Sequence, residues 1–340
     1  MSPIVLHNPL EISWYKNLLD LTFLLCLGLA IGYSARQYRR GRVVYAVLLV
    51  TAFFYGMLLE LSGMVLHHSY TQGTFAVMLN FRMVPGLQDA TLMPGYVPIF
   101  YPVFLFLGYK IVESLDIPSL WQRALTGGLV MACVDAPYII QGGLPQIGWW
   151  TWHQWKMYQL WLGWPLADLW WQMTWDALFF YVLWRAVPHL DARRSNTVTL
   201  LGFPLAAAVG INLVAPLLHI PLILVTYLGT PQWPLVVALV LGYVIVAVRA
   251  MRLSPADFVE PVTVIVAGIY VLSMAVMVIG NALYEKGLTE YIAVQSAALI
   301  ILCGFVAYPA LRGRSRRVPA TDAESHTSRS DRAADPMDTR

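Results

Sequence analysis

Four carboxylates lie at or inside strongly apolar segments of this sequence: Glu60, Asp135, Asp168 and Asp176. An ionisable side chain within a membrane is costly to bury and by default marks a functional site. A carboxylic acid in apolar surroundings keeps its proton to higher pH than one in water, so it can deliver that proton to a C=C bond. Water or an internal alkene would then capture the tertiary cation. The residue types therefore predict hydration or cyclisation of an alkene.

The four acids are expected to have different roles. Glu60 or Asp135 is the predicted proton donor, whereas Asp168 and Asp176 would orient water or take up the final proton. Two of the acids also have structural interpretations. Asp168 follows a helix start, where a carboxylate is favoured by the helix dipole. Asp135 could instead satisfy backbone amides near the proline kink that follows it.

Aromatic side chains are concentrated around these acids. Aromatic faces attract cations, Trp most strongly, and would stabilise a carbocation in an apolar pocket. We expect the following substrate-binding residues: Tyr70, Trp150, Trp152, Trp164, Trp171, Gln172 and Trp175. An aromatic belt at the membrane interface is the alternative for the loop tryptophans. A belt does not explain Trp171 and Trp175, because they continue into a helix beside a polar stripe of Asp168, Gln172 and Asp176 at i, i+4 and i+8 spacing.

The composition indicates an integral membrane protein. Hydrophobic residues make up 58% of the chain, charged residues 12%, and the mean hydropathy is +0.61, which is too apolar for a soluble domain of this length. The net charge of +3 gives no case for a nucleic-acid partner. No Asp-Asp-x-x-Asp cluster and no Gly-rich dinucleotide loop occurs, so neither a metal nor a cofactor is expected.

Apolar stretches long enough to span a bilayer recur along the chain. They predict an all-α transmembrane bundle of about nine helices, near residues 17–35, 43–66, 96–115, 122–141, 165–187, 197–217, 233–250, 258–280 and 291–311. Residues 218–232 are the least certain part, since prolines interrupt the long apolar run there. A re-entrant piece or a tenth helix is the alternative.

Basic residues alternate between the two sides of these predicted crossings. Fifteen Lys and Arg residues fall on one side and four on the other, so the positive-inside rule places the N-terminus outside and the C-terminus in the cytoplasm. We expect residues 1–311 to form the bundle, with a catalytic core at about 43–187, and residues 312–340 to form a disordered cytoplasmic tail. The protein is predicted to be a multi-pass protein of the cell membrane.

Several ordered blocks of the sequence resemble a known family. They are Glu60-Leu61-Ser62-Gly63 with Tyr70, Val97-Pro98, Asp135-Ala136-Pro137, Gly148-Trp149-Trp150-Thr151-Trp152 and Gly163-Trp164-Pro165-Leu166-Ala167-Asp168. In this order they are similar to blocks of the membrane carotenoid-biosynthesis proteins typified by bisanhydrobacterioruberin hydratase, over about residues 50–187. That family carries Asn at the position of Asp168. The resemblance implies an enzyme that acts on a carotenoid or related isoprenoid.

Residue chemistry and resemblance lead to the same expectation. The chain would be an enzyme of isoprenoid metabolism, either a lyase that hydrates an alkene or an isomerase that cyclises one, with a lipophilic isoprenoid and membrane lipid as its partners. A proton-coupled transporter is the alternative, because intramembrane carboxylates also form proton relays. An apolar aromatic pocket closed to the cytoplasm favours the enzyme, whereas a polar path through both leaflets favours the transporter.

Overall fold

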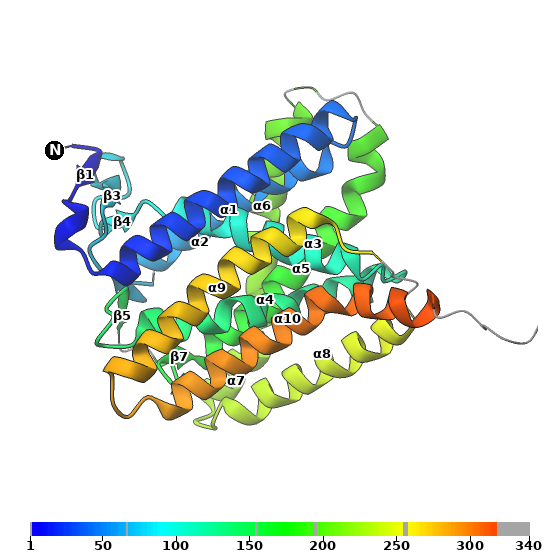
Figure 1. Ribbon diagram of the computed structural model, residues 1–340. Coiled ribbons are helices and arrows are strands. Elements are labelled where there is room, and N and C mark those ends of the chain that lie inside the picture. The colour runs from blue at the N-terminus through cyan, green and yellow to red at the C-terminus, as the bar shows by residue number, and fades with distance from the viewer. Residues whose placement is uncertain are drawn as a thin grey trace, which may run out of the picture.

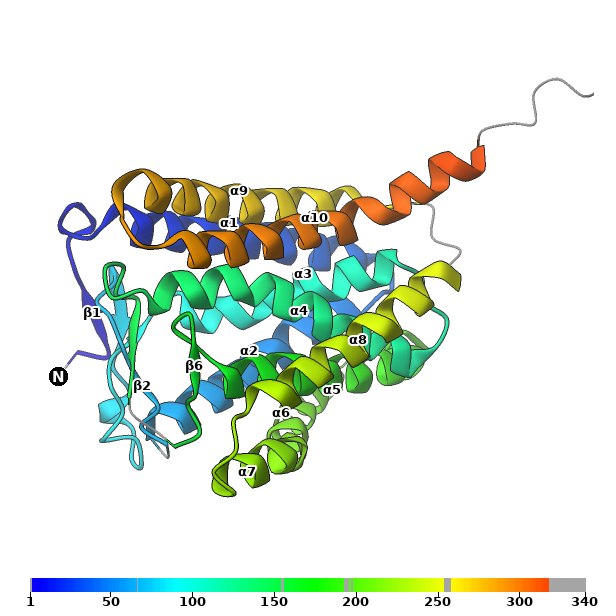
Figure 2. The ribbon, with the colours of Figure 1, turned by 90° about the horizontal axis from the view of Figure 1, so that it is seen from below.

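The computed structural model describes residues 2–65, 67–153, 156–192, 196, 198–253 and 258–317. Within them the chain forms a helical bundle with three layers (Figures 1 and 2). Helices α1 (Trp14–Arg39), α9 (Pro261–Tyr284) and α10 (Thr289–Arg317) form one outer layer, and α3 (Val97–Ser114) and α4 (Leu120–Gly143) form the middle layer. The other outer layer contains α2 (Val44–Val65), α5 (Leu166–Ala192), α6 (Phe203–Val214), α7 (Ile220–Tyr227) and α8 (Trp233–Leu253).

Eight stretches of the described chain are long and apolar enough to cross a membrane. Helix α5 is not among them, but it runs the full depth of the bundle. Asp168 in its first turn lines a cavity that Glu60, near the end of α2, also lines. At the other end of α5, Asp191 accepts hydrogen bonds from the backbone N–H groups of Val43 and Val44 at the start of α2. Including α5, nine segments of the described chain run through the bundle, as predicted. The first crossing therefore begins at one end of the bundle and the last ends at the other (Figure 1).

The uncertain region after residue 197 forms a single interrupted crossing. The π-helical turn η3 (Val198–Gly202), α6, the 3-10 turn η4 (Ala215–His219) and α7 follow one another across Val198–Tyr227. Pro216 lies in η4 and Pro221 in the first turn of α7, and proline supplies no N–H and crowds the preceding turn. The prolines thus interrupt the helix within one crossing. The alternative of a tenth membrane-crossing helix is therefore wrong.

Helices α3 and α4 form the centre of the bundle. Inside the protein, 94% of the apolar window of α4 and 78% of that of α3 are buried, against 22–44% for the other membrane-spanning stretches. Small residues let α4 approach its neighbour α5. A Cβ added at Gly128 would lie 2.1 Å from the Met173 carbonyl oxygen, so any larger residue there would push the two helices apart.

Short strands connect the helices at the end of the bundle where the N-terminus lies. Strands β1 (Ile4–Leu6), β3 (Val77–Leu79) and β4 (Met93–Pro94) form one small antiparallel sheet. Strand β2 (Tyr70–Gln72) pairs with β5 (Trp150–Trp152), and β6 (Leu160–Trp161) pairs with β7 (Trp164–Pro165) around a turn in which Leu162 and Gly163 have positive φ. Such a turn matches the twist of a tight hairpin. The pairing of β2 with β5 joins the loop that follows α2 to the loop that follows α4.

The opposite end of the bundle carries an ion cluster around a buried lysine. The Lys110 ammonium contacts the Glu113 carboxylate, lies 2.7 Å from Glu260 Oε2 and donates to the Tyr33 hydroxyl at 3.1 Å. Arg42 Nη2 lies 3.2 Å from Glu113 Oε1. Lys110 lies within α3, inside the predicted crossing 96–115, and is only 1% exposed. By the positive-inside rule this end faces the cytoplasm, and the strands lie on the outer side.

The C-terminal boundary differs from the expected one. Helix α10 continues beyond residue 311 to Arg317, and Arg312 donates to the backbone carbonyls of Met251 and Arg252 at the end of α8. These hydrogen bonds satisfy carbonyls that a helix end leaves free. The rest of the predicted tail, 318–340, lies outside the described residues.

Candidate functional site

A cavity of about 420 Å³ lies in the outer half of the bundle, beneath strands β2 and β5. Its size falls within the usual range of ligand pockets. It is lined from α2 to α7 by Leu59, Glu60, Ser62, Gly63, His67, Ser69, Tyr70, Gln72, Phe100, Tyr101, Tyr138, Ile139, Trp150, Trp152, Met157, Tyr158, Ala167, Asp168, Trp171, Gln172, Trp175, Pro216, His219, Ile223 and Tyr227. The two ionisable acids in this lining come from different helices, which places both within reach of one ligand.

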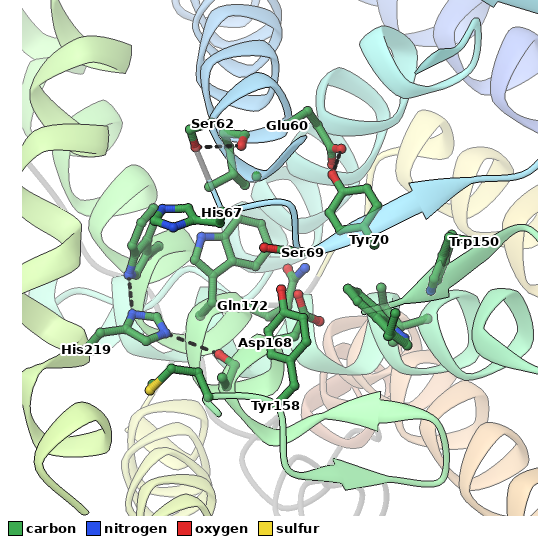
Figure 3. A pocket seen from close by; sticks show the side chains of 18 of the residues that line it. Glu60, Ser62, His67, Ser69, Tyr70, Trp150, Tyr158, Asp168, Gln172 and His219 are labelled. Carbon is green, nitrogen blue, oxygen red and sulfur yellow. Dashed lines mark hydrogen bonds between the residues drawn. The ribbon is translucent and has the colours of Figure 1, made fainter. Parts of the chain in front are cut away.

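Glu60 lies on the α2 wall, where two tyrosine hydroxyls hold its carboxylate. Tyr101 of α3 donates to Oε1 at 2.7 Å, and Tyr70 of β2 donates to Oε2 (Figure 3). Burial, and after it the neighbouring Glu60, raise the pKa of Tyr70 well above its ordinary value. Tyr70 therefore keeps its proton and acts as a donor. Both oxygens of Glu60 accept a hydrogen bond, which favours the ionised carboxylate and suits a group that faces a positive charge.

Asp168 lies in the first turn of α5, on another wall of the cavity (Figure 3). The Trp164 indole Nε1 donates to its Oδ2 at 2.7 Å. This geometry depends on the β6–β7 hairpin, because the Trp152 indole donates to the carbonyl of Gly163 at 2.9 Å and fixes the turn before Trp164. Oδ1 of Asp168 has no hydrogen-bond partner among the described residues. This oxygen is free to carry a proton toward a ligand in the cavity.

Gln172 follows Asp168 by one helical turn and also lines the cavity. Its side chain is only 3% exposed, yet its amide has no hydrogen-bond partner in the described part of the chain. Buried amides are normally paired, and an unpaired one costs about 1–3 kcal/mol. An amide that faces a cavity beside a carboxyl group can be satisfied by a bound water or by a polar group of a ligand.

The rest of the wall is mostly aromatic. Tyr138 and Trp150 lie with ring centroids 5.1 Å apart, and Trp171 stacks on Tyr55 at 6.3 Å with an angle of 7° between the rings. The Trp175 indole donates to His219 Nδ1 at 2.9 Å, which holds that ring against η4. Ring faces of this kind stabilise a positive charge that develops in an apolar site. The walls therefore fit a ligand that is apolar at rest and cationic during a reaction.

Asp135 and Asp176, the other predicted catalytic acids, do not line the cavity. Asp176 is 1% exposed and accepts a hydrogen bond from the Tyr55 hydroxyl at 3.1 Å. Asp135 is fully buried in α4, and neither of its oxygens has a partner among the described residues. A buried charge without a partner is very unfavourable, so Asp135 is expected to be a neutral acid. Of the polar stripe on α5, the first two members face the cavity and the third lies behind it.

The predicted substrate-binding residues come together almost completely. Those that line the cavity are Tyr70, Trp150, Trp152, Trp171, Gln172 and Trp175. Trp164 does not line it but binds Asp168. An interfacial belt would leave the loop tryptophans in contact with lipid headgroups, yet Trp149 is fully buried, and Trp164 and Trp150 are 3% and 6% exposed. The belt interpretation fits Trp161, which is 45% exposed, while Trp155 lies outside the described residues.

Sequence reasoning missed several lining residues, chiefly Tyr101, Tyr138, Tyr158 and His219. Tyr101 had a usable signal. It follows the start of its helix by about one turn, which puts it at the same depth as Glu60. His219 had none, because it lies in the proline-broken region whose course was uncertain.

On α3, α4 and α5, buried apolar side chains separate this cavity from the ion cluster at the cytoplasmic end. From Ala177 to Trp184 every buried side chain of α5 is apolar, and so is the run from Val103 to Leu107 in α3. In α4 the run from Leu129 to Val134 is equally apolar. A proton relay across the membrane needs polar groups or water through this layer. The arrangement favours a pocket closed to the cytoplasm over a transport path.

The fold and the cavity define a multi-pass membrane protein with an acidic, aromatic pocket in its outer half. Comparison with known proteins gives no match to a protein-family model, to a curated protein or to a solved structure.

Proposed function

We propose that this protein is a membrane enzyme that protonates a C=C bond of a lipophilic isoprenoid and then hydrates or cyclises the resulting cation. The observation that carries the proposal is that Glu60 of α2 and Asp168 of α5 face one aromatic-lined cavity. A protonating acid, an acceptor for the final proton and aromatic faces for the cation are the groups that this chemistry requires. The cell membrane is the proposed location.

The hydrogen bonds favour Asp168 as the proton donor and Glu60 as the acceptor, the reverse of the roles expected from the sequence. Oδ1 of Asp168 has no partner among the described residues, whereas both oxygens of Glu60 accept hydrogen bonds from tyrosines. In the first step the O–H bond of Asp168 breaks, a C–H bond forms at the less substituted alkene carbon, and a tertiary cation remains. The carboxylate left on Asp168 and that of Glu60 both face this cation.

The second step decides the product. For hydration, a water held by the Gln172 amide attacks the cation, a C–O bond forms, and the proton released from that water passes to Glu60. For cyclisation, an internal alkene attacks, a C–C bond forms, and Glu60 takes a proton from the carbon next to the new cation. Proton exchange between Glu60 and Asp168 through cavity water then restores both groups. The first outcome makes the protein a lyase in the hydratase sense, and the second makes it an isomerase.

Three observations support an isoprenoid substrate. The lining is aromatic, the protein is embedded in lipid, and the blocks around Glu60 and Asp168 resemble those of the carotenoid hydratase family. The apolar layer below the cavity makes a proton-coupled transporter the weaker proposal.

The test is mass spectrometry of lipid extracts from isoprenoid-producing hosts, with and without the protein. A new product heavier by one water indicates hydration, and a new isomer of unchanged mass indicates cyclisation. Hosts that accumulate carotenoids and hosts that accumulate shorter terpenoids are both needed, because the cavity does not distinguish them by its chemistry. No new product in either kind of host would contradict the proposal.

Replacing Trp164 by Phe is expected to slow product formation about tenfold, because the hydrogen bond that orients Asp168 is lost and such a bond to a carboxyl group contributes about 1.5–3 kcal/mol. The measurement is the initial rate in membranes that contain equal amounts of protein. Trp161→Phe, on the other strand of the same hairpin but 45% exposed, is the matched control. Equal rates for the two variants would contradict a positioning role for Trp164.

A further inference from the structure

The cavity reaches the surface of the bundle between α2 and α7. On one side its rim is formed by Leu59, Ser62 and Gly63 near the end of α2. On the other side the rim is formed by Ile223 and Tyr227 of α7, which are 37% and 62% exposed. These exposed side chains belong to the same lining as the acids, so the cavity and the outer surface are continuous there.

The broken crossing explains why an opening exists at this position. Helix α6 packs closely along α2 toward the cytoplasmic end. At Pro216 the chain changes to the 3-10 turn η4, and α7 continues at the edge of its layer (Figure 2). A proline at this point removes a helical hydrogen bond and redirects the chain. Helices α2 and α7 are therefore not packed together beside the cavity as α2 and α6 are below it.

The surface around the opening is suited to lipid. Residues 198–233 contain no Asp, Glu, Lys or Arg. Leu217, Ile220 and Leu224, which surround Ile223 on the outside of this crossing, are 62%, 46% and 57% exposed. Exposed apolar side chains in a membrane-spanning segment contact acyl chains. The Ile223 side of the opening thus faces the bilayer, whereas the exposed Lys156 lies 4.6 Å from the centre of the Tyr227 ring and marks the outer end of the opening.

The volume of the cavity limits how much of a ligand it holds. At 420 Å³ the cavity lies in the lower part of the range of about 300–1,000 Å³ that is usual for ligand pockets. A pocket of this size fits the end of a long isoprenoid, and the rest of such a chain would extend through the opening. The acids lie inside and the exposed apolar rim outside, which orients a chain with its reacting end inward.

We propose that the isoprenoid chain enters sideways from the outer leaflet between α2 and α7, with its terminal alkene inside the cavity and its remaining length in the bilayer. This proposal rests on the proposed function for the class of ligand. It adds the route, the orientation and the position of the reacting bond at the end of a linear chain. Ile223 and Tyr227 on one rim and Ser62 on the other would contact the chain where it leaves the cavity.

The test uses photolabelling of the full chain in phosphatidylcholine vesicles with geranylgeraniol that carries a diazirine at its hydrocarbon end. Label is expected on the cavity segment of α5 that contains Gln172, and unlabelled geranylgeraniol should compete for it. Ile223→Trp fills the opening and is expected to reduce this labelling roughly tenfold, because the larger ring occupies the space through which the chain would enter. Leu224→Trp is the matched control, since Leu224 neighbours Ile223 but does not line the cavity.

Ser62→Trp narrows the opposite rim and is expected to act like Ile223→Trp, which keeps the test decisive if one variant is poorly folded. Full labelling of α5 in both variants would overturn the sideways route, and no competed label in the wild type would overturn binding of a chain end in the cavity. A failure of the proposed reaction is distinguished from a failure of the entry route by measuring product formation as well as labelling. If labelling follows the prediction but Glu60→Gln forms product at the wild-type rate, the entry route stands and the proposed roles of the acids fail.

Discussion

Replacing Asp168 by Asn is expected to lower product formation about 100-fold or more, because proton transfer by a positioned acid contributes about 10²–10⁴-fold to a rate. The amide has the same shape and can still accept a hydrogen bond from Trp164, so the change removes the proton and little else. Glu60→Gln is expected to have an effect of similar size, since both tyrosine donors would then meet a neutral group. The measurement is the initial rate of product formation in isolated membranes.

Asp89→Asn provides the control, because this acid is exposed in an outer loop and lies away from the cavity. The resemblance to the hydratase family makes the result at position 168 especially informative, since that family carries Asn there. Full activity of Asp168→Asn would mean that the enzyme works as those proteins are expected to, with Glu60 as the acid. It would contradict the division of roles that the hydrogen bonds favour.

The acids that lie behind the cavity should behave differently. Asp176 is held by Tyr55, whose ring stacks on Trp171, so its removal acts on the aromatic wall rather than on the reacting bond. Asp135 has no contact with the cavity, and its neutral form resembles an amide. If Asp135→Asn proved as harmful as Asp168→Asn, the donor would have to be Asp135, and the substrate would have to reach a part of α4 that the cavity does not expose.

The sequence predicted how deep each acid lies in the membrane, but not which way its side chain points. Apolar length locates each crossing, and the rise of about 1.5 Å per residue then puts Glu60 and Asp168 at the same outer level. Which side of a helix faces a cavity depends on the rotation of the helix about its own axis. Helix α4 is buried on nearly all sides and is apolar all round, so no periodic pattern shows where Asp135 points. This is why Asp135 was predicted to be catalytic although it lies outside the cavity lining.

Contacts between segments that are distant in the sequence could not be predicted either. Strand β2 pairs with β5, which brings Tyr70 opposite Trp152, but each strand is only three residues long and carries no alternating pattern of its own. Tyr70 was predicted from its residue type beside Glu60, not from this pairing. The broken crossing at Pro216 was visible as an anomaly, and its consequence, an opening toward lipid, depends on packing that a single sequence does not specify.

Replacing Lys110 by Met is expected to lower the free energy of unfolding by about 3 kcal/mol, because it leaves Glu113 and Glu260 close together without their shared cation. The loss should appear as a lower melting temperature in detergent. Arg42→Met is the matched control: its side chain is 42% exposed, and exposed ion pairs contribute only about 0–1 kcal/mol. Equal destabilisation by the two changes would contradict a buried, stabilising role for Lys110.

A triple variant separates loss of the cation from loss of packing. Lys110→Met combined with Glu113→Gln and Glu260→Gln removes every charge that the lysine neutralised, and a neutral, well-packed replacement of a buried ion pair is often as stable as the original. Recovery of most of the lost stability would show that uncompensated carboxylates were the cause, since residues in one network are not additive. If the triple variant were as unstable as Lys110→Met, the lysine stem would matter chiefly as packing material.

Acid should release the same cluster in the wild type. Burial alone raises the pKa of Glu260, but the hydrogen bonds from Lys110 and Tyr33 and the lysine charge outweigh it, so the net pKa is below the ordinary value. An unfolded Glu titrates near pH ~4.3, so this stabilisation is fully present above that pH and is lost as the pH falls through the lower pKa of the folded state. The difference in melting temperature between wild type and Glu260→Gln should therefore shrink on acidification below about pH 4. A difference that stayed constant would mean that Glu260 contributes by shape and not by charge.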